Sequence, residues 1–199
     1  MPALSEGTYQ GDWLLEEFGA PNYCREEISV LAPVDLNSGA VIGLATTLTT
    51  YYVPYDNAGG GSTGKSAAAA GILLDSVSAL PSMSCSLVDS ANVGTGTTVQ
   101  AHCLAVDDII EVLGAGDAEL NVYATIVSVP TTKTFTIATS SVTDTTYPVV
   151  IRKLNQKAVG ILRGPAVVAN LDWGTSDGTG ITAGTAELLA LLIKIREEV

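Results

Sequence analysis

The sequence predicts a mainly β protein of the α+β class: a small mixed β core with a C-terminal helix, plus an inserted β-module. Three observations predict it. The 199 residues are 47% hydrophobic, which is enough to build a core. Charged residues are sparse at 15%, whereas long surface helices need many Glu, Lys and Arg. Thr and Val instead fill several short runs, as half-buried strands require.

Residues 1–27 show no sustained period and predict an N-terminal arm rather than a strong element. The arm is nevertheless rich in large apolar residues: Tyr9, Trp13, Leu14, Leu15, Phe18 and Tyr23. They are too many for a purely solvated tail. Two alternatives follow, packing on the protein's own core or packing on a partner.

Residues 28–81 and 149–199 predict one discontinuous core. The first part reads as the strands "ISVLA" and "AVIGLATTLTTYYVPY", then an apolar strand "AAGILLDSV" and a junction at "SALPSMSC". The second part contains "AVGILRG", which echoes "AAGILLD". We expect these two strands to pair in one sheet.

Residues 82–148 predict an inserted β-module, either a small barrel or sandwich-like. The segment 105–141 holds three strand-like runs and no helical periodicity. The last two runs, "NVYATIVSV" and "KTFTIATS", are separated only by "PTT" and predict a hairpin.

A helix is predicted at the C-terminal end. We expect Thr182 or a near neighbour to cap it. The segment "AELLALLIKIREEV" then places one apolar face toward the sheet, formed by Leu188, Leu191, Leu192 and Ile195.

The net charge of −12 argues against nucleic acid and anionic membrane surfaces as partners. No basic and apolar leader opens the chain, and the longest apolar segment, 188–193, is too short to span a bilayer, so we expect a soluble protein. Cys24, Cys85 and Cys103 are an odd, widely spaced set, which argues against a disulfide framework. One histidine, His102, without a C-x-x-C pair predicts no metal site.

The octet "GGGSTGKS" at 59–66 satisfies the phosphate-loop pattern G-x-x-x-x-G-K-[ST] through Gly59, Gly64, Lys65 and Ser66. Such a loop binds phosphate only between a buried strand and a helix N-terminus. Here Pro54 and Asp56 interrupt the preceding strand, and Gly71 ends any following helix within two turns. We interpret the octet as a chance match in a surface loop, and expect no nucleotide cofactor.

No catalytic constellation stands out, so we expect a protein that is not an enzyme. The chain has no G-x-S-x-G elbow and no acid–base dyad with typical spacing. The neighbouring carboxylates Asp107 and Asp108, and Glu16 and Glu17, are interpreted as solvated charges.

As an ordered set, five segments resemble the lambda-type phage head decoration proteins. They are "GDWLLEEFGAPNYCREEISVLA" (11–32), "SGAVIGLATT" with "YYVPYD" (38–56), "AAGILLDSVSA" (69–79), "KAVGILRGPAVVANLDW" (157–173) and the closing helix. The resemblance covers about two-thirds of the chain. The block 82–148 departs from it, because compact family members have a short connection there.

The resemblance implies a homotrimer on the outer surface of the virion capsid, made in the host cytoplasm. It would bind the expanded shell at three-fold sites, clamp major capsid protein subunits and stabilise the DNA-filled head. It also implies that the arm adds a strand to the capsid protein, with Tyr9, Trp13, Leu14 and Phe18 as contact residues. The alternative is a carbohydrate-binding or adhesive β protein that acts through 82–148, for instance on a host-surface glycan.

Overall fold

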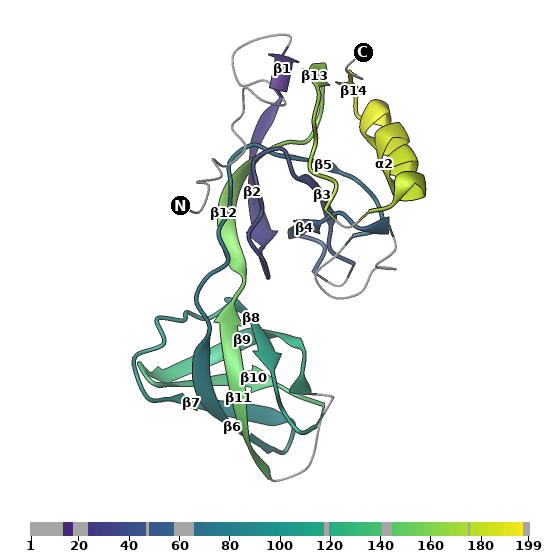
Figure 1. Ribbon diagram of the computed structural model, residues 1–199. Helices are drawn as coiled ribbons and strands as arrows, with labels where there is room; N and C mark the ends of the chain where they lie inside the picture. Colours follow the sequence, from purple (N-terminus) through teal and green to yellow (C-terminus); the bar gives the residue numbers. More distant parts are fainter. Residues whose placement is uncertain are drawn as a thin grey trace, which may run out of the picture. The chain divides into compact units, whose positions relative to one another are not determined.

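The structure is a computed structural model that describes residues 14–17, 24–46, 48–57, 66–117, 120–140, 145–174 and 176–196. The described chain is mainly β with one helix and contains small closed β-barrels, which confirms the predicted fold class. It divides into two compact units, 1–78 with 156–199 (unit 1) and 79–155 (unit 2) (Figure 1). No helix in the described ranges is long and apolar enough to cross a membrane.

Unit 1 contains a closed five-stranded barrel. Its strands follow the order β12 (Asn155–Ile161), β2 (Arg25–Leu31), β4 (Tyr52–Pro54), β3 (Val41–Leu44) and β5 (Gly71–Leu73). The two echoing strands pair as predicted, since β12 lies antiparallel to β5 with Gly160 opposite Leu73 and Ile161 opposite Ile72.

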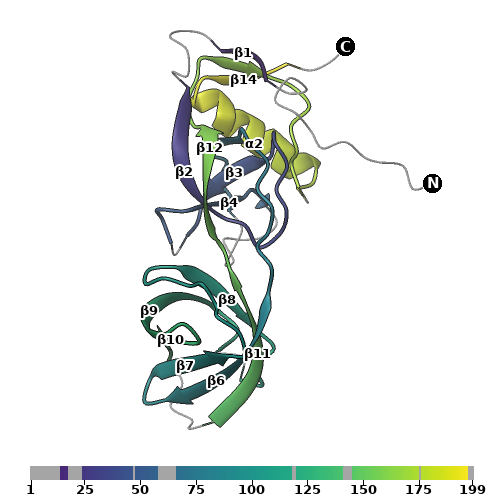
Figure 2. The same ribbon diagram turned by 90° about the vertical axis from the view of Figure 1, so that its left-hand side faces the viewer.

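A second, three-stranded sheet of unit 1 joins the two ends of the chain. Its order is β1 (Leu14–Glu17), β13 (Ala166–Val168) and β14 (Ile193–Ile195), and we call it the arm sheet. Helix α2 (Gly178–Ala190) lies beside it in both ribbon views (Figures 1 and 2).

Tyr55 anchors α2 to the core of unit 1. Its side chain is 1% exposed, and its hydroxyl donates to the Gly180 carbonyl oxygen at 2.7 Å. The Tyr55 and Trp173 rings meet edge to face with centroids 5.9 Å apart. Gly184 faces both rings, and a Cβ there would lie 2.5 Å from the Trp173 ring. The helix therefore approaches this aromatic pair through its glycines.

The predicted position of the helix was wrong. The N-cap is Asp177, whose side chain accepts from the Gly180 N–H, so the helix begins before Thr182. It ends at Ala190 because Leu192 adopts a positive φ of 62° and the next residues form β14. In β14, Ile193 pairs in parallel with β13 and is fully buried. A helix that continued past Ala190 would lose this strand pairing.

Unit 2 is a closed six-stranded barrel. Its strands are β6 (Met83–Ser90), β7 (Val93–Thr98), β8 (Ile109–Leu113), β9 (Tyr123–Thr131), β10 (Thr134–Ala138) and β11 (Thr145–Lys153), in the order β10-β7-β6-β11-β8-β9. The predicted hairpin is confirmed as β9 and β10. Phe135 on β10 is fully buried in the core that the six strands enclose.

Candidate functional site

The arm sheet is the candidate site, because it holds β1, the one described strand that lies wholly within the N-terminal arm. β1 pairs antiparallel with β13: Leu14 lies opposite Val168, and Glu17 lies opposite Ala166. β13 in turn pairs in parallel with β14. The arm strand is thereby attached to a strand whose two end residues are almost completely buried, since Ala166 is 2% and Val168 0% exposed.

Apolar packing holds β1 in place. Leu14 is half-buried and packs against a core cluster that includes Val168 and Ile193. Cys24, directly before β2, is fully buried in the same cluster, and its Sγ donates to the Pro165 carbonyl oxygen at 3.5 Å. Of the two alternatives for the arm, packing on the protein's own core therefore applies to Leu14.

The outer edge of β1 is the feature that a partner strand could use. β1 is the outermost strand of the arm sheet, and no other strand among the described residues pairs with that edge. An edge strand presents backbone N–H and C=O groups to which an extended segment can bind. The register shifts between Leu14 and Glu16, and Leu15 at this irregularity is 46% exposed. The edge thus offers both backbone groups and an apolar side chain.

Leu14 is the one predicted contact residue that the structure places. Tyr9, Trp13 and Phe18 lie outside the described residues. The sequence did not indicate β14 as the third strand, because its residues continue the apolar spacing of the helix. The exposed Lys194 between buried Ile193 and half-buried Ile195 was the available strand signal.

Ser66 is the only described residue of the four phosphate-loop positions, since Gly59, Gly64 and Lys65 lie outside the described residues. Ser66 is buried and forms an isolated parallel bridge with Tyr55. Its hydroxyl donates to the Ala68 carbonyl oxygen at 3.0 Å. The chain then continues into β5 rather than into a helix. Ser66 is therefore placed by strand-like contacts, without the helix N-terminus on which a phosphate loop depends.

The interpretation of Asp108 as a solvated charge was wrong. Its side chain is 8% exposed and lies 2.6 Å from the Lys153 Nζ. It also accepts from the Ala105 N–H at 2.7 Å and from the Asn155 Nδ2 at 3.3 Å. This network ties the end of β11 to the start of β8 and is structural. Asp107, by contrast, is exposed.

The cysteines and His102 form no chemical centre among the residues that the structure covers. Cys24 and Cys85 are buried, Cys103 is exposed, and none of the three is in a disulfide bond. His102 is buried against the Phe135 ring, and its Nδ1 accepts from the Leu104 N–H at 3.0 Å. No group of three or more metal-ligating side chains occurs in the described ranges.

Unit 2 is expected to lose stability as the pH rises above about 9. Burial raises the pKa of the Cys85 thiol from 9.0 to about 11. Burial, helped by Glu111 and opposed by Arg152, raises the pKa of Tyr123 from 10.0 to about 12. The unfolded chain therefore releases these protons at a lower pH than the folded chain, and the stability falls as the pH rises through each interval.

Guanidinium titrations at pH 8 and pH 11 measure this loss. The Cys85→Ala variant is expected to show a smaller difference between the two pH values than the wild type. The exposed Cys103 provides the control, because Cys103→Ala should leave the difference unchanged. Equal differences in all three proteins would contradict the assignment to Cys85.

Comparisons with known proteins add no relative: no protein-family model matches the chain, and no curated protein matches it.

Proposed function

We propose that this protein is a phage capsid decoration protein, a structural component of the virion and not an enzyme. It binds as a homotrimer to the outer surface of the expanded shell at three-fold sites and clamps neighbouring major capsid protein subunits. The observation that carries the proposal is the place of β1, which lies within the arm that the resemblance assigns to capsid binding. This strand forms the edge of a sheet, and no other strand among the described residues pairs with its outer side.

The arm contact follows from the chemistry of that edge. A strand of the capsid protein adds to β1 through backbone hydrogen bonds, and the apolar arm residues supply side-chain contacts. Pairing with β13 orders β1 before it meets a partner, which lowers the entropic cost of binding. Three arms on one trimer then act together, so that modest single contacts give a firmly held clamp.

Unit 2 is inserted in the chain of unit 1 between Ser78 and Gln156. The chain leaves unit 1 at Ser78 and returns at Gln156, and the Gln156 Nε2 donates to the Ser78 carbonyl oxygen at 2.8 Å. The two ends are therefore close enough for a short connection to replace the intervening residues. Unit 2 also closes its own barrel around its own core, so unit 1 does not need it to complete a sheet.

Replacing residues 79–155 by a three-residue glycine linker tests this arrangement. The shortened protein is expected to remain a soluble trimer by mass in solution and to sediment with expanded shells at the wild-type ratio. A control that carries the linker between Ser78 and Ala79 but keeps unit 2 isolates the effect of the linker. A monomeric shortened protein would place unit 2 in the trimer interface and contradict the proposal that unit 1 alone forms the clamp.

A further inference from the structure

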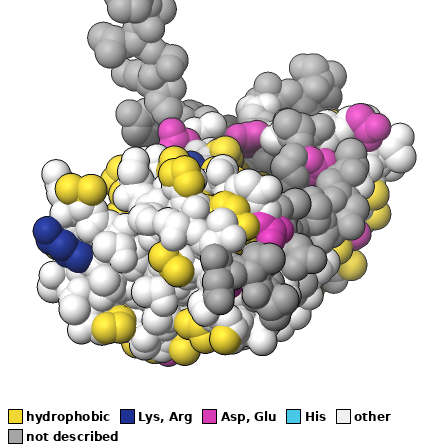
Figure 3. All heavy atoms as spheres, turned by 90° about the horizontal axis from the view of Figure 1, so that it is seen from below, with side chains coloured by type: hydrophobic (Ala, Val, Ile, Leu, Met, Phe, Trp, Pro, Cys, Tyr) yellow, Lys and Arg dark blue, Asp and Glu magenta, His cyan; other side chains and the backbone are white. Residues whose placement is uncertain are grey.

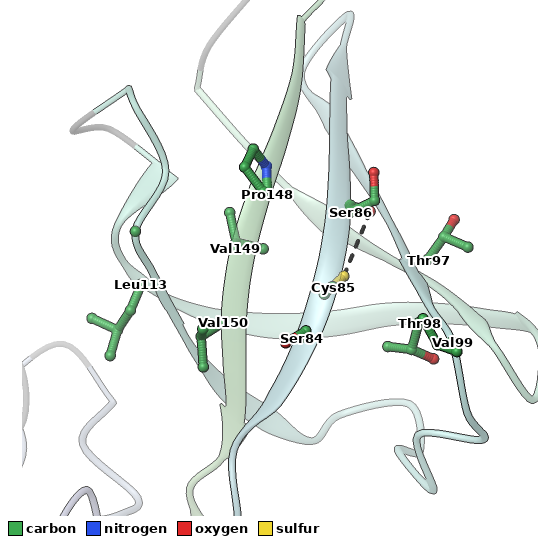
Figure 4. A pocket seen from close by; sticks show the side chains of 11 residues that line it. Ser84, Cys85, Ser86, Thr97, Thr98, Val99, Leu113, Pro148, Val149 and Val150 are labelled. Atoms are coloured by element: carbon green, nitrogen blue, oxygen red, sulfur yellow. Dashed lines mark hydrogen bonds between the residues drawn. The ribbon is translucent and has the colours of Figure 1, made fainter.

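An open groove of about 510 Å³ lies on the outer face of the unit 2 barrel, over β7, β6, β11 and β8. Its middle strand is β6, which contributes Ser84 and Ser86 (Figure 4). Thr97 and Val99 line one side from β7 and the residue after it. The other side of the groove is formed by β11 and β8. Val150 of β11 lies opposite Ser84 of β6, and on its far side it lies opposite Leu113 of β8.

The alternation of β6 explains why a groove forms there. Cys85 and Leu87 point into the barrel and are buried, while Ser84 and Ser86 are exposed on the outer face. Serine side chains are short, whereas the flanking outward residues are larger, with Pro148 opposite Ser86 on β11. Small side chains on the middle strand between larger ones on its neighbours leave a channel along β6.

The groove combines exposed aliphatic surface with hydroxyl groups and carries no charge. Val99 is 82% exposed, Leu113 45% and Val150 40%, which is a high exposure for such side chains. Ser84, Ser86 and Thr97 add hydroxyl groups beside them. None of the eleven lining residues is charged, although the chain has a net charge of −12.

A row of hydroxyl groups continues from the groove across the next two strands. Thr97 lies opposite Ser86 on one side and opposite Thr134 of β10 on the other, and Thr134 lies opposite Thr131 of β9. The Thr131 and Thr134 hydroxyls hydrogen-bond at 2.8 Å. Neighbouring strands are about 4.8 Å apart, so this row presents hydroxyl groups at a regular spacing.

In the space-filling view of Figure 3, hydrophobic side chains lie singly among uncharged polar groups, and Lys, Arg, Asp and Glu side chains are few. A charged ligand would find no charged partner among the residues that line the groove, and this favours an uncharged ligand.

We propose that this groove binds an uncharged polysaccharide, with a short run of neutral sugar rings lying along β6. A pyranose ring has apolar C–H faces and a rim of hydroxyl groups. The aliphatic side chains of Val99, Leu113 and Val150 contact the C–H faces, and the serine and threonine hydroxyls both donate to and accept from the sugar hydroxyls. The volume falls in the range of known ligand sites.

The affinity of one groove for such a ligand is weak. No aromatic side chain lines the groove, so the stacking that strengthens many sugar sites is absent from it. Binding at one site is expected in the range of about 0.1–1 mM. A surface that displays many copies of the protein would still hold a repeating polysaccharide through avidity.

The full-length protein and immobilised dextran, laminarihexaose and chitopentaose test the proposal, with heparin as a charged comparator. At least one neutral glycan is expected to retain the protein, and heparin is not. Val150→Glu places a charge in the groove and is expected to weaken retention at least tenfold. Ser84→Ile fills the groove without adding charge and is expected to do the same, which keeps the test decisive if the glutamate variant fails to fold.

Val127→Glu is the matched control, because Val127 on β9 is 56% exposed and does not line the groove. It is expected to bind within twofold of the wild type. Retention of none of the neutral glycans, or equal retention of all variants, overturns the proposal. A change in the mass of the assembly caused by Val150→Glu would show instead that a second copy of the chain covers the groove. No shells enter this assay, so its result is independent of capsid binding.

Discussion

Phe135→Ala is expected to lower the free energy of unfolding of unit 2 by about 3–5 kcal/mol. Phe135 is fully buried, its ring meets His102 edge to face with centroids 5.5 Å apart, and it fills the space over Gly96 on the paired strand β7. A Cβ on Gly96 would lie 2.2 Å from the ring, so the two positions are packed against each other. Removing the ring leaves a cavity in a closed barrel that has little freedom to collapse.

Hydrogen exchange measured residue by residue gives the size and the location of this loss. Faster exchange is expected in the strands of unit 2, while β3, β5 and β12 of unit 1 should exchange at wild-type rates, because each unit has a core of its own. Phe135→Leu, which conserves most of the volume, should cost less than about 1.5 kcal/mol. A loss below about 1 kcal/mol for Phe135→Ala would contradict the inference that packing of this ring stabilises unit 2.

Deletion of residues 2–17 is expected to weaken binding to expanded shells by at least about 100-fold. The deletion removes β1, and with it the edge proposed to pair with the capsid protein, from all three subunits of the trimer at once. It also removes Tyr9, Trp13 and Leu14, and aromatic residues often dominate the energy of an interface.

Co-sedimentation with purified expanded shells at a series of protein concentrations measures the change. Deletion of residues 2–8, which carry none of the predicted contact residues, is the matched control and should bind within about threefold of the wild type. The double variant Tyr9→Ala, Trp13→Ala keeps β1 intact and separates lost side-chain contacts from lost packing on β13. If the protein without residues 2–17 forms trimers and binds shells normally, the arm is not the clamp.

The sequence predicted two kinds of strand pair: strands that are neighbours in the chain, and strands that contain the same short sequence. The hairpin of β9 and β10 could be read from two Thr- and Val-rich runs with a short turn, because hairpin pairing is local. The pairing of β5 with β12 was indicated by the shared "GIL" segment, which forms β5 and begins with the last two residues of β12. Barrel closure could not be read in this way, because it depends on pairing between distant strands.

Three strands of unit 2 were missed, β6, β7 and β11, and the composition of the first two is unusual for strands. β6 carries outward serines, which read as a junction, although Cys85, Leu87 and Asp89 alternate with them toward the core. β7 contains Gly94 and Gly96, which normally weaken a strand. Both glycines lie against large side chains of β10, so the fold needs them where local propensity argues against a strand.

The C-terminal helix shows how tertiary pairing overrides local spacing. The apolar residues from Leu188 to Ile195 fit one helical face, yet the Leu191 and Leu192 carbonyl oxygens accept from the Gly164 and Ala166 N–H groups. These bonds turn the chain into β14 and complete the arm sheet. The candidate site therefore depends on a strand that periodicity alone assigns to the helix.

The central claim, that this protein decorates an expanded capsid, is tested most directly by electron cryo-microscopy of expanded and unexpanded shells incubated with the purified protein. The account predicts trimeric density at the three-fold sites of expanded shells alone, with the arm sheet against the capsid protein. A protein that is monomeric in solution and leaves expanded shells bare would contradict it.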